Sequence, residues 1–138
     1  MARIKEMDTA GRFDLFVDLH NPGAGSKQPF YFIPPDQLLT NLGKKNLDRF
    51  FQASRAEITG PFALSGKLRV AGPKYDKAWK KISKNWVVEN TNKHVVAVCL
   101  ETAWNTPHST TEGYRQVGRQ LGLAILRYLE TNHRPVSN

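Results

Sequence analysis

The sequence has little cysteine and no long hydrophobic run. Its single cysteine, Cys99, lies within the apolar stretch Val95 to Leu100 and cannot form an internal disulfide, which excludes a disulfide-stabilised scaffold. No apolar run approaches the roughly 18 residues that cross a membrane, and residues 1–8 lack the apolar core of a signal peptide. We therefore predict no membrane contact, and the sequence assigns the protein to no compartment.

Acidic residues are also in deficit: 12 Asp and Glu stand against 20 Lys and Arg, for a net charge of +8. The basic residues are dispersed along the chain instead of forming one block, which favours a solvated basic surface over a nucleic-acid footprint. A chain of 138 residues with 40% hydrophobic content is the size of one ordinary domain. We predict a single domain over residues 1–138.

Two apolar segments, residues 13–19 and 94–100, predict buried strands, and residues 29–34 predict a third, shorter one. The spacing of apolar residues predicts helices at 1–11, 36–56 and 75–86. The capping-box pattern Ser109–Glu112 predicts a last helix that ends near Thr131. Strands separated by helices indicate an α/β fold with a mainly parallel sheet flanked by helices.

The two most apolar strands are each followed by a residue with catalytic chemistry. His20 comes directly after the first and Glu101 after the second. In open α/β sheets the ligand crevice lies at the carboxyl ends of the strands, so the two side chains share one crevice if the strands are parallel neighbours. An imidazole is a good zinc ligand, and a free carboxylate can move protons beside the metal. The alternatives are that His20 caps its own loop and that Glu101 caps a helix or pairs with an arginine.

Three short motifs carry a resemblance to a known family. They are the segment Asp18 to His20 after an apolar strand, the segment Cys99 to Thr102 after a valine-rich strand, and Tyr114 to Gly118 in the final helix. Together they resemble the C-terminal half of the zinc carboxypeptidase family, the carboxypeptidase A-like metallopeptidases, over residues 13–129. The separation of His20 from Glu101 is of the order that this family uses between its last zinc-binding histidine and its catalytic glutamate.

The resemblance implies roles for named residues. His20 is then the third ligand of a single zinc ion, and Glu101 is the general base and acid. Trp104, Asn105 and Thr106 follow Glu101 directly and line the substrate pocket in this interpretation. The implied activity is hydrolysis of a peptide or amide bond next to a free carboxylate, by water that the metal activates.

The sequence also departs from the family. The His-x-x-Glu motif that supplies the other two zinc ligands is missing upstream of His20, as are the residues that hold the substrate carboxylate. Tyr75 does not align with the family's substrate-capping tyrosine, and Trp86 is the alternative for that place. The remaining histidines, His94, His108 and His133, form no short ligand spacing with His20.

Because a catalytic zinc needs three protein ligands, we predict that the chain is the C-terminal part of a larger catalytic domain. Met1 is then an internal methionine, and the chain alone is inactive. The surfaces that such a truncation exposes predict possible self-association.

A second hypothesis belongs to another class of protein. Several lysines surround two tryptophans in the predicted helix 75–86, and tryptophan rings between lysines can stack on bases. The residues concerned are Lys77, Lys80, Lys81, Lys84, Trp79 and Trp86. This hypothesis describes a basic module that binds nucleic acid or another polyanion without catalysis, although the helical spacing of the tryptophans favours core packing.

Overall fold

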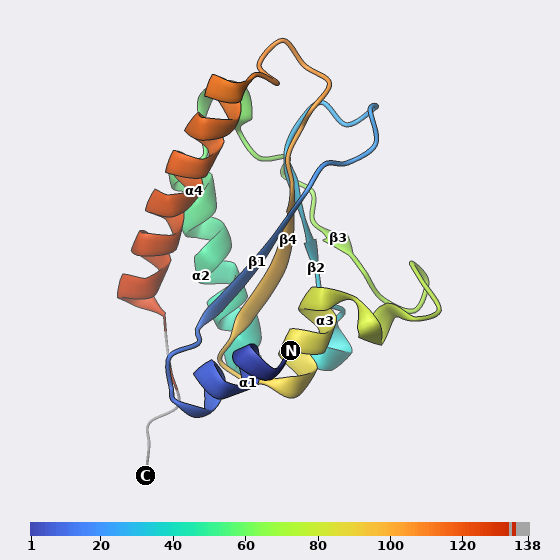
Figure 1. Ribbon diagram of the computed structural model, residues 1–138, viewed down its shortest axis with the longest axis vertical. Helices are drawn as coiled ribbons and strands as arrows, with labels where there is room; N and C mark the ends of the chain where they lie inside the picture. Colours follow the sequence, from blue (N-terminus) through green and yellow to red (C-terminus); the bar gives the residue numbers. More distant parts are fainter. Residues whose placement is uncertain (133, 135–138) are drawn as a thin grey trace.

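The computed structural model describes residues 1–132 and 134, and a four-stranded sheet forms its centre. The strands are β1 (Leu15–His20), β2 (Phe30–Ile33), β3 (Arg69–Val70) and β4 (Val96–Glu101), in the order β1-β4-β2-β3. β1 and β4 are parallel, β4 and β2 are antiparallel, and β2 and β3 are parallel (Figure 1). The α/β class is confirmed, but the sheet is mixed, which the prediction of a mainly parallel sheet missed.

The direction of β2 explains the difference. The loop of residues 21–29 that joins β1 to β2 contains no helix. A connection this short reverses the chain, whereas a parallel partner needs a longer crossover. β4 arrives later in the sequence, lies between β1 and β2, and runs parallel to the first and antiparallel to the second.

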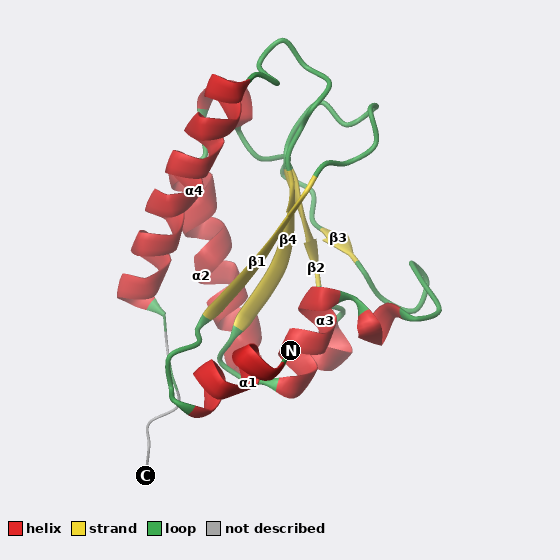
Figure 2. Ribbon diagram, viewed as in Figure 1, coloured by secondary structure: helices red, strands yellow, loops and turns green. Residues whose placement is uncertain are grey.

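Four α-helices cover the two faces of the sheet. They are α1 (Ala2–Thr9), α2 (Asn41–Glu57), α3 (Ser83–Asn90) and α4 (Thr111–Thr131). α2 and α4 lie on one face, and α1 and α3 lie on the other (Figure 2). Within the described residues, no helix is both long and apolar enough to span a membrane.

Two of the predicted helices are interrupted. The prediction for 36–56 begins with a 3-10 turn at Asp36–Leu38, and α2 starts only after Thr40, whose hydroxyl accepts a hydrogen bond from the Gly43 amide at 3.1 Å. The prediction for 75–86 divides at Ile82, whose extended backbone separates a 3-10 turn at Trp79–Lys81 from α3. A capping hydroxyl or an extended residue ends a helical turn locally, which the apolar spacing alone does not reveal.

The main core lies between the sheet and the pair α2 and α4. Every second residue of β4 points into this core, and three aromatic rings pack edge to face within it. Phe50 lies with its ring centroid 5.6 Å from that of Tyr31 and 5.5 Å from that of Tyr128. Edge-to-face rings at such distances are a favourable arrangement for aromatic side chains. This face of the sheet is therefore apolar along its whole length.

The opposite face is divided. Its lower part is a smaller apolar cluster under α1 and α3, formed by Phe13, Val87, Val88, Val95 and Ala97. Its upper part, at the carboxyl ends of β1 and β4, carries the side chains of Asp18, His20, Cys99 and Glu101. The change from apolar to polar along one face marks where chemistry is possible.

β1 lies at an edge of the sheet. Among the described residues only β4 pairs with it, so its outer row of backbone groups is free of strand partners. Residues 15–18 are half-buried, and Leu19 is 61% exposed. The apolar run predicted a buried strand, whereas β1 is only half-buried because it lies at the edge of the sheet.

The loop between β4 and α4 is held close to the helix it precedes. The Thr110 hydroxyl caps α4 by accepting a hydrogen bond from the Gly113 amide at 3.1 Å. A Cβ atom added at Gly113 would lie 2.0 Å from the carbonyl oxygen of His108. Only glycine lets the loop approach this closely, which fixes the path of the chain directly after Glu101.

Candidate functional site

The carboxyl ends of β1 and β4 bring the predicted residues together. In the parallel register His20 lies opposite Glu101, and Asp18 lies opposite Cys99. Side chains two residues apart in a strand share a face, so all four lie on the α3 side of the sheet. The prediction that His20 and Glu101 lie side by side at the carboxyl ends of neighbouring parallel strands is confirmed.

Asp18 holds the imidazole of His20. The Nε2 atom of His20 lies 3.3 Å from Oδ1 of Asp18, while the Ser83 hydroxyl donates to Oδ2 of the same carboxylate at 2.6 Å. A carboxylate beside one ring nitrogen favours a proton on that nitrogen and leaves the lone pair on the other. The Nδ1 atom is then the one available as a metal ligand.

Glu101 is buried and only partly satisfied. It is 8% exposed, and its Oε1 atom accepts a weak hydrogen bond from the Cys99 thiol at 3.6 Å. Its Oε2 atom is buried and has no hydrogen-bond partner. Burial, together with the charge of Glu101, raises the pKa of the Cys99 thiol to about 12, so the thiol stays neutral and acts as a donor. A buried carboxylate oxygen without a partner is costly and points to a functional group.

Lys84 brings a cation into the same place. The residue is 3% exposed, and its ammonium forms no hydrogen bond or ion pair with any described residue. Its Nζ atom lies 5.5 Å from the centroid of the Phe32 ring. Burial lowers the pKa of Lys84, and the charges of Asp18 and Glu101 oppose that shift.

These groups line one cavity of about 220 Å³, which we call the polar cavity. Its walls combine charged side chains with an aromatic and aliphatic side. The lining residues are Asp18, His20, Phe32, Tyr75, Ile82, Ser83, Lys84, Cys99 and Glu101. The cavity is partly open, since His20 and Tyr75 are exposed, and converging polar groups with a shifted pKa are common features of binding and catalytic sites.

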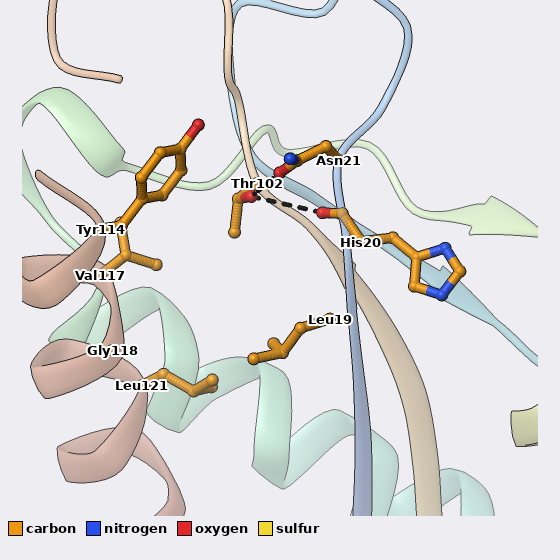
Figure 3. A pocket seen from close by; sticks show the side chains of 8 residues that line it. All are labelled: Leu19, His20, Asn21, Thr102, Tyr114, Val117, Gly118 and Leu121. Atoms are coloured by element: carbon orange, nitrogen blue, oxygen red, sulfur yellow. Dashed lines mark hydrogen bonds between the residues drawn. The ribbon is translucent and has the colours of Figure 1, made fainter. Parts of the chain in front are cut away.

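A second cavity, of about 300 Å³, lies on the other side of the same strand ends, and we call it the apolar cavity. Leu19, Tyr114, Val117 and Leu121 form much of its wall (Figure 3). Figure 3 shows the imidazole of His20 pointing away from this cavity, so only the backbone of His20 takes part, accepting a hydrogen bond from the Thr102 hydroxyl at 3.3 Å. The reactive side chains therefore belong to the polar cavity.

The residues predicted to line the substrate pocket join two loops instead. The indole of Trp104 donates to the carbonyl of Pro22, and the Asn105 amide donates to the carbonyl of Ala24 at 3.3 Å. Thr106 bonds within its own loop, with its hydroxyl 3.0 Å from that of Ser109. These contacts connect the segment after β4 to the segment after β1, and substrate binding by these residues stays a prediction.

The other histidines lie away from His20. His94 precedes β4 at the opposite end of the sheet, where its Nε2 atom lies 3.3 Å from Oδ1 of Asp14. His108 packs edge-on against Phe62, with ring centroids 6.0 Å apart. His133 lies outside the described residues.

The structure also bears on the basic surface of the second hypothesis. Lys80 pairs with Glu89 at 2.6 Å and lies over the ring of Trp79, with 5.6 Å between Nζ and the centroid. Trp79 and Trp86 are half-buried. Lys84 is not on this surface, because it is buried in the polar cavity.

A zinc ion finds only part of its ligands here. In the described part of the chain, Asp18, His20 and Cys99 form the group whose ligand atoms all lie within 4.8 Å of one another. Asp18 already accepts from Ser83 and contacts His20, and Cys99 is a neutral donor to Glu101. This donor set fits one imidazole ligand with a supporting carboxylate, whereas a catalytic zinc needs three protein ligands.

Comparisons of this chain with protein-family models, with curated proteins and with solved structures find no match. The sequence identified His20 and Glu101, gave Asp18 and Cys99 no role in the chemistry, and assigned Lys84 to a basic surface instead of to this cavity. The signal that could have found Asp18 and Cys99 was the two-residue period of strands, which places Asp18 on the same face as His20 and Cys99 on the same face as Glu101.

Proposed function

We propose that this chain is the C-terminal part of a zinc-dependent, metallocarboxypeptidase-like hydrolase that cleaves a peptide or amide bond. One observation carries the proposal: His20 and Glu101 lie opposite each other at the carboxyl ends of adjacent parallel strands, and Glu101 keeps a buried oxygen atom without a partner. A ligand and a proton-transfer group side by side are the two protein functions that metal-assisted hydrolysis requires.

The roles of the chain's own residues follow from their surroundings. His20 supplies one metal ligand through Nδ1, because Asp18 occupies its Nε2 side. Glu101 takes a proton from the attacking water on Oε2 and passes it to the leaving nitrogen, while Cys99 holds Oε1 in place. A metal held there in part by His20 would supply polarisation of the scissile carbonyl and activation of the attacking water.

The remaining ligands must come from outside the described residues. Of the two edge strands of the described sheet, β1 and β3, β1 is the one that holds His20. A further strand beside β1 would have its own end next to the imidazole, since neighbouring strands lie about 4.8 Å apart. The open edge therefore supports the proposal that another protein segment completes the site.

A zinc titration of the chain tests the ligand assignment. We expect weak zinc binding, seen by NMR as shifts of the His20 ring resonances, and loss of that binding in His20→Ala. His108→Ala is the matched control, because its ring packs against Phe62 away from the site, and it should bind as the wild type does. Retention of one tightly bound zinc per chain in native mass spectrometry would contradict the incomplete site.

Glu101→Gln tests the catalytic assignment in the protein extended upstream of Met1. The amide keeps the size of the side chain but removes its basicity, so we expect hydrolysis of N-acylated dipeptides to be lost while zinc content is unchanged. Appreciable turnover by Glu101→Gln would refute the proposal. Binding to nucleic acid that weakens steeply with salt, and is indifferent to this substitution, would favour the basic module instead.

A further inference from the structure

Lys84 is the group in the polar cavity that the proposed reaction does not use. Lys84 is 3% exposed and has neither hydrogen bond nor ion pair with a described residue, so only the ring of Phe32 and the more distant charges of Asp18 and Glu101 offset the cost of burying its charge. Its position in the wall of a cavity beside Glu101 means that a partner can reach it.

The carboxylates nearby do not fill this role. Asp18 accepts from Ser83 at 2.6 Å and lies 3.3 Å from the ring of His20. Glu101 accepts from Cys99, and neither carboxylate forms an ion pair with Lys84. The ammonium of Lys84 thus feels these two carboxylates only from a distance and has no direct ion pair with a described residue.

The rest of the wall is suited to a carbon chain. The ring of Phe32 lies 5.5 Å from Nζ of Lys84, and its centroid is 5.1 Å from that of Tyr75. Ile82 adds an aliphatic surface to the same cavity. An apolar wall that leads to an ammonium matches a short methylene chain that ends in an anion.

We propose that the polar cavity receives the side chain of the residue that follows the scissile bond, and that Lys84 selects an acidic one, glutamate or aspartate. This inference rests on the proposed function, since the adjacent His20 and Glu101 define where the scissile bond lies. It adds the substrate class, which is a peptide or acylated amino acid that ends in a residue with a carboxylate side chain.

Three small probes test the assignment by NMR titration of the full chain, in the presence and absence of zinc. N-acetyl-L-glutamic acid α-amide carries only the side-chain carboxylate, N-acetyl-L-norvaline carries only the α-carboxylate, and N-acetyl-L-lysine amide carries a cation. We expect the first probe alone to shift the backbone amides of Lys84, Cys99 and Glu101. This comparison needs no variant.

Lys84→Met removes the charge and keeps much of the length of the side chain. We expect it to weaken binding of the glutamic acid amide by about ten-fold or more, the usual effect of losing a hydrogen bond to a charged group. Lys81→Met is the matched control, because it removes an exposed lysine of the preceding turn and changes the net charge equally. Lys84→Gln provides a second variant, and thermal unfolding shows that each variant is folded.

The outcomes separate the alternatives. Equal binding of the norvaline probe would assign Lys84 to the α-carboxylate and overturn the inference, as would preferred binding of the lysine amide or no response to any probe. The zinc response of His20 is measured in the same samples. If the His20 resonances do not respond to zinc while the glutamic acid amide still binds, the proposed function is refuted and the anion site at Lys84 remains. If His20 responds to zinc but the glutamic acid amide does not bind, only the acidic preference is refuted.

Discussion

The two sides of the same strand ends have opposite character. On the α4 side, Leu19 and Leu100 lie opposite each other, and the apolar cavity continues the main core. On the α3 side, one residue further along each strand, His20 lies opposite Glu101 and the cavity is polar. Alternate residues of the two strands thus have different effects: those on the α4 side contribute stability, and those on the α3 side cost stability.

The difference shows that the two faces of a short strand have to be considered separately when its burial is predicted from sequence. A six-residue strand such as β1 presents three residues to each face, so its average hydrophobicity describes neither face. Asp18 interrupts an otherwise apolar run because it faces the polar cavity, while Val17 faces the main core. Groups retained against stability are expected where function requires them.

The largest effect should come from the apolar side. Phe50 is fully buried between two aromatic rings, so Phe50→Ala should lower the free energy of unfolding by about 3–5 kcal/mol. Leu126→Ala, on the exposed side of α4, should change it by about 0.5 kcal/mol or less. Urea denaturation measures both. A similar loss in the two variants would remove the contrast between core and surface on this side.

A smaller loss is expected where the polar cavity is attached to the fold. The buried amide of Asn85 donates to the carbonyl oxygens of Ala71 and Trp79 at 2.6 and 2.7 Å, which holds the segment with Tyr75 against α3. Asn85→Ala should cost about 1–3 kcal/mol and speed hydrogen exchange in residues 71–79. The exposed Asn90, which bonds only to Trp86, provides the control. Unchanged exchange would show that Asn85 does not anchor the cavity wall.

The contact between Asp18 and His20 should affect zinc binding more than folding. Asp18→Asn removes the charge that orients the ring, and we expect zinc affinity at His20 to fall by about ten-fold. Asp36→Asn, at an exposed ion pair with Lys44, should leave the affinity unchanged. The zinc titration of the His20 resonances measures both, and equal affinities in the two variants would contradict the orienting role.

The smallest effect should have the opposite sign. Lys84→Met removes a buried cation that has no hydrogen bond or ion pair with a described residue and should raise the free energy of unfolding by about 1 kcal/mol at neutral pH. The pKa of Lys84 is lower in the folded protein than its ordinary value of 10.5, so the folded chain loses this proton first and wild-type stability gains relative to the variant as pH rises. The difference between the urea midpoints of the wild type and Lys84→Met should therefore be smaller near pH 10 than near neutral pH. A destabilising Lys84→Met would mean that the lysine supports the fold.

The sequence was informative wherever one segment determines its own structure. The long apolar stripe predicted the end of α4 near Thr131, and the apolar runs located β1 and β4. The capping box placed the cap of α4 at Ser109, whereas the structure has it at Thr110. The antiparallel place of β2 was not predictable, because strand order depends on which edges meet in the folded chain. The burial of Lys84 was missed for a related reason: the helical pattern was assumed to continue through Ile82, where the backbone is extended and α3 starts with a new orientation.

The pairing of β1 with β4 also has a consequence for how the chain folds. β2, α2, β3 and α3 all lie between the two strands in the sequence, so their contact closes a long loop. Contacts of high sequence separation slow folding, and during synthesis β1 leaves the ribosome long before its partner exists. The apolar side of β1 is open to wrong partners throughout that interval. We therefore expect His20 and Glu101 to meet late in folding, so that a newly made chain acquires the proposed site at almost the same moment as its complete sheet.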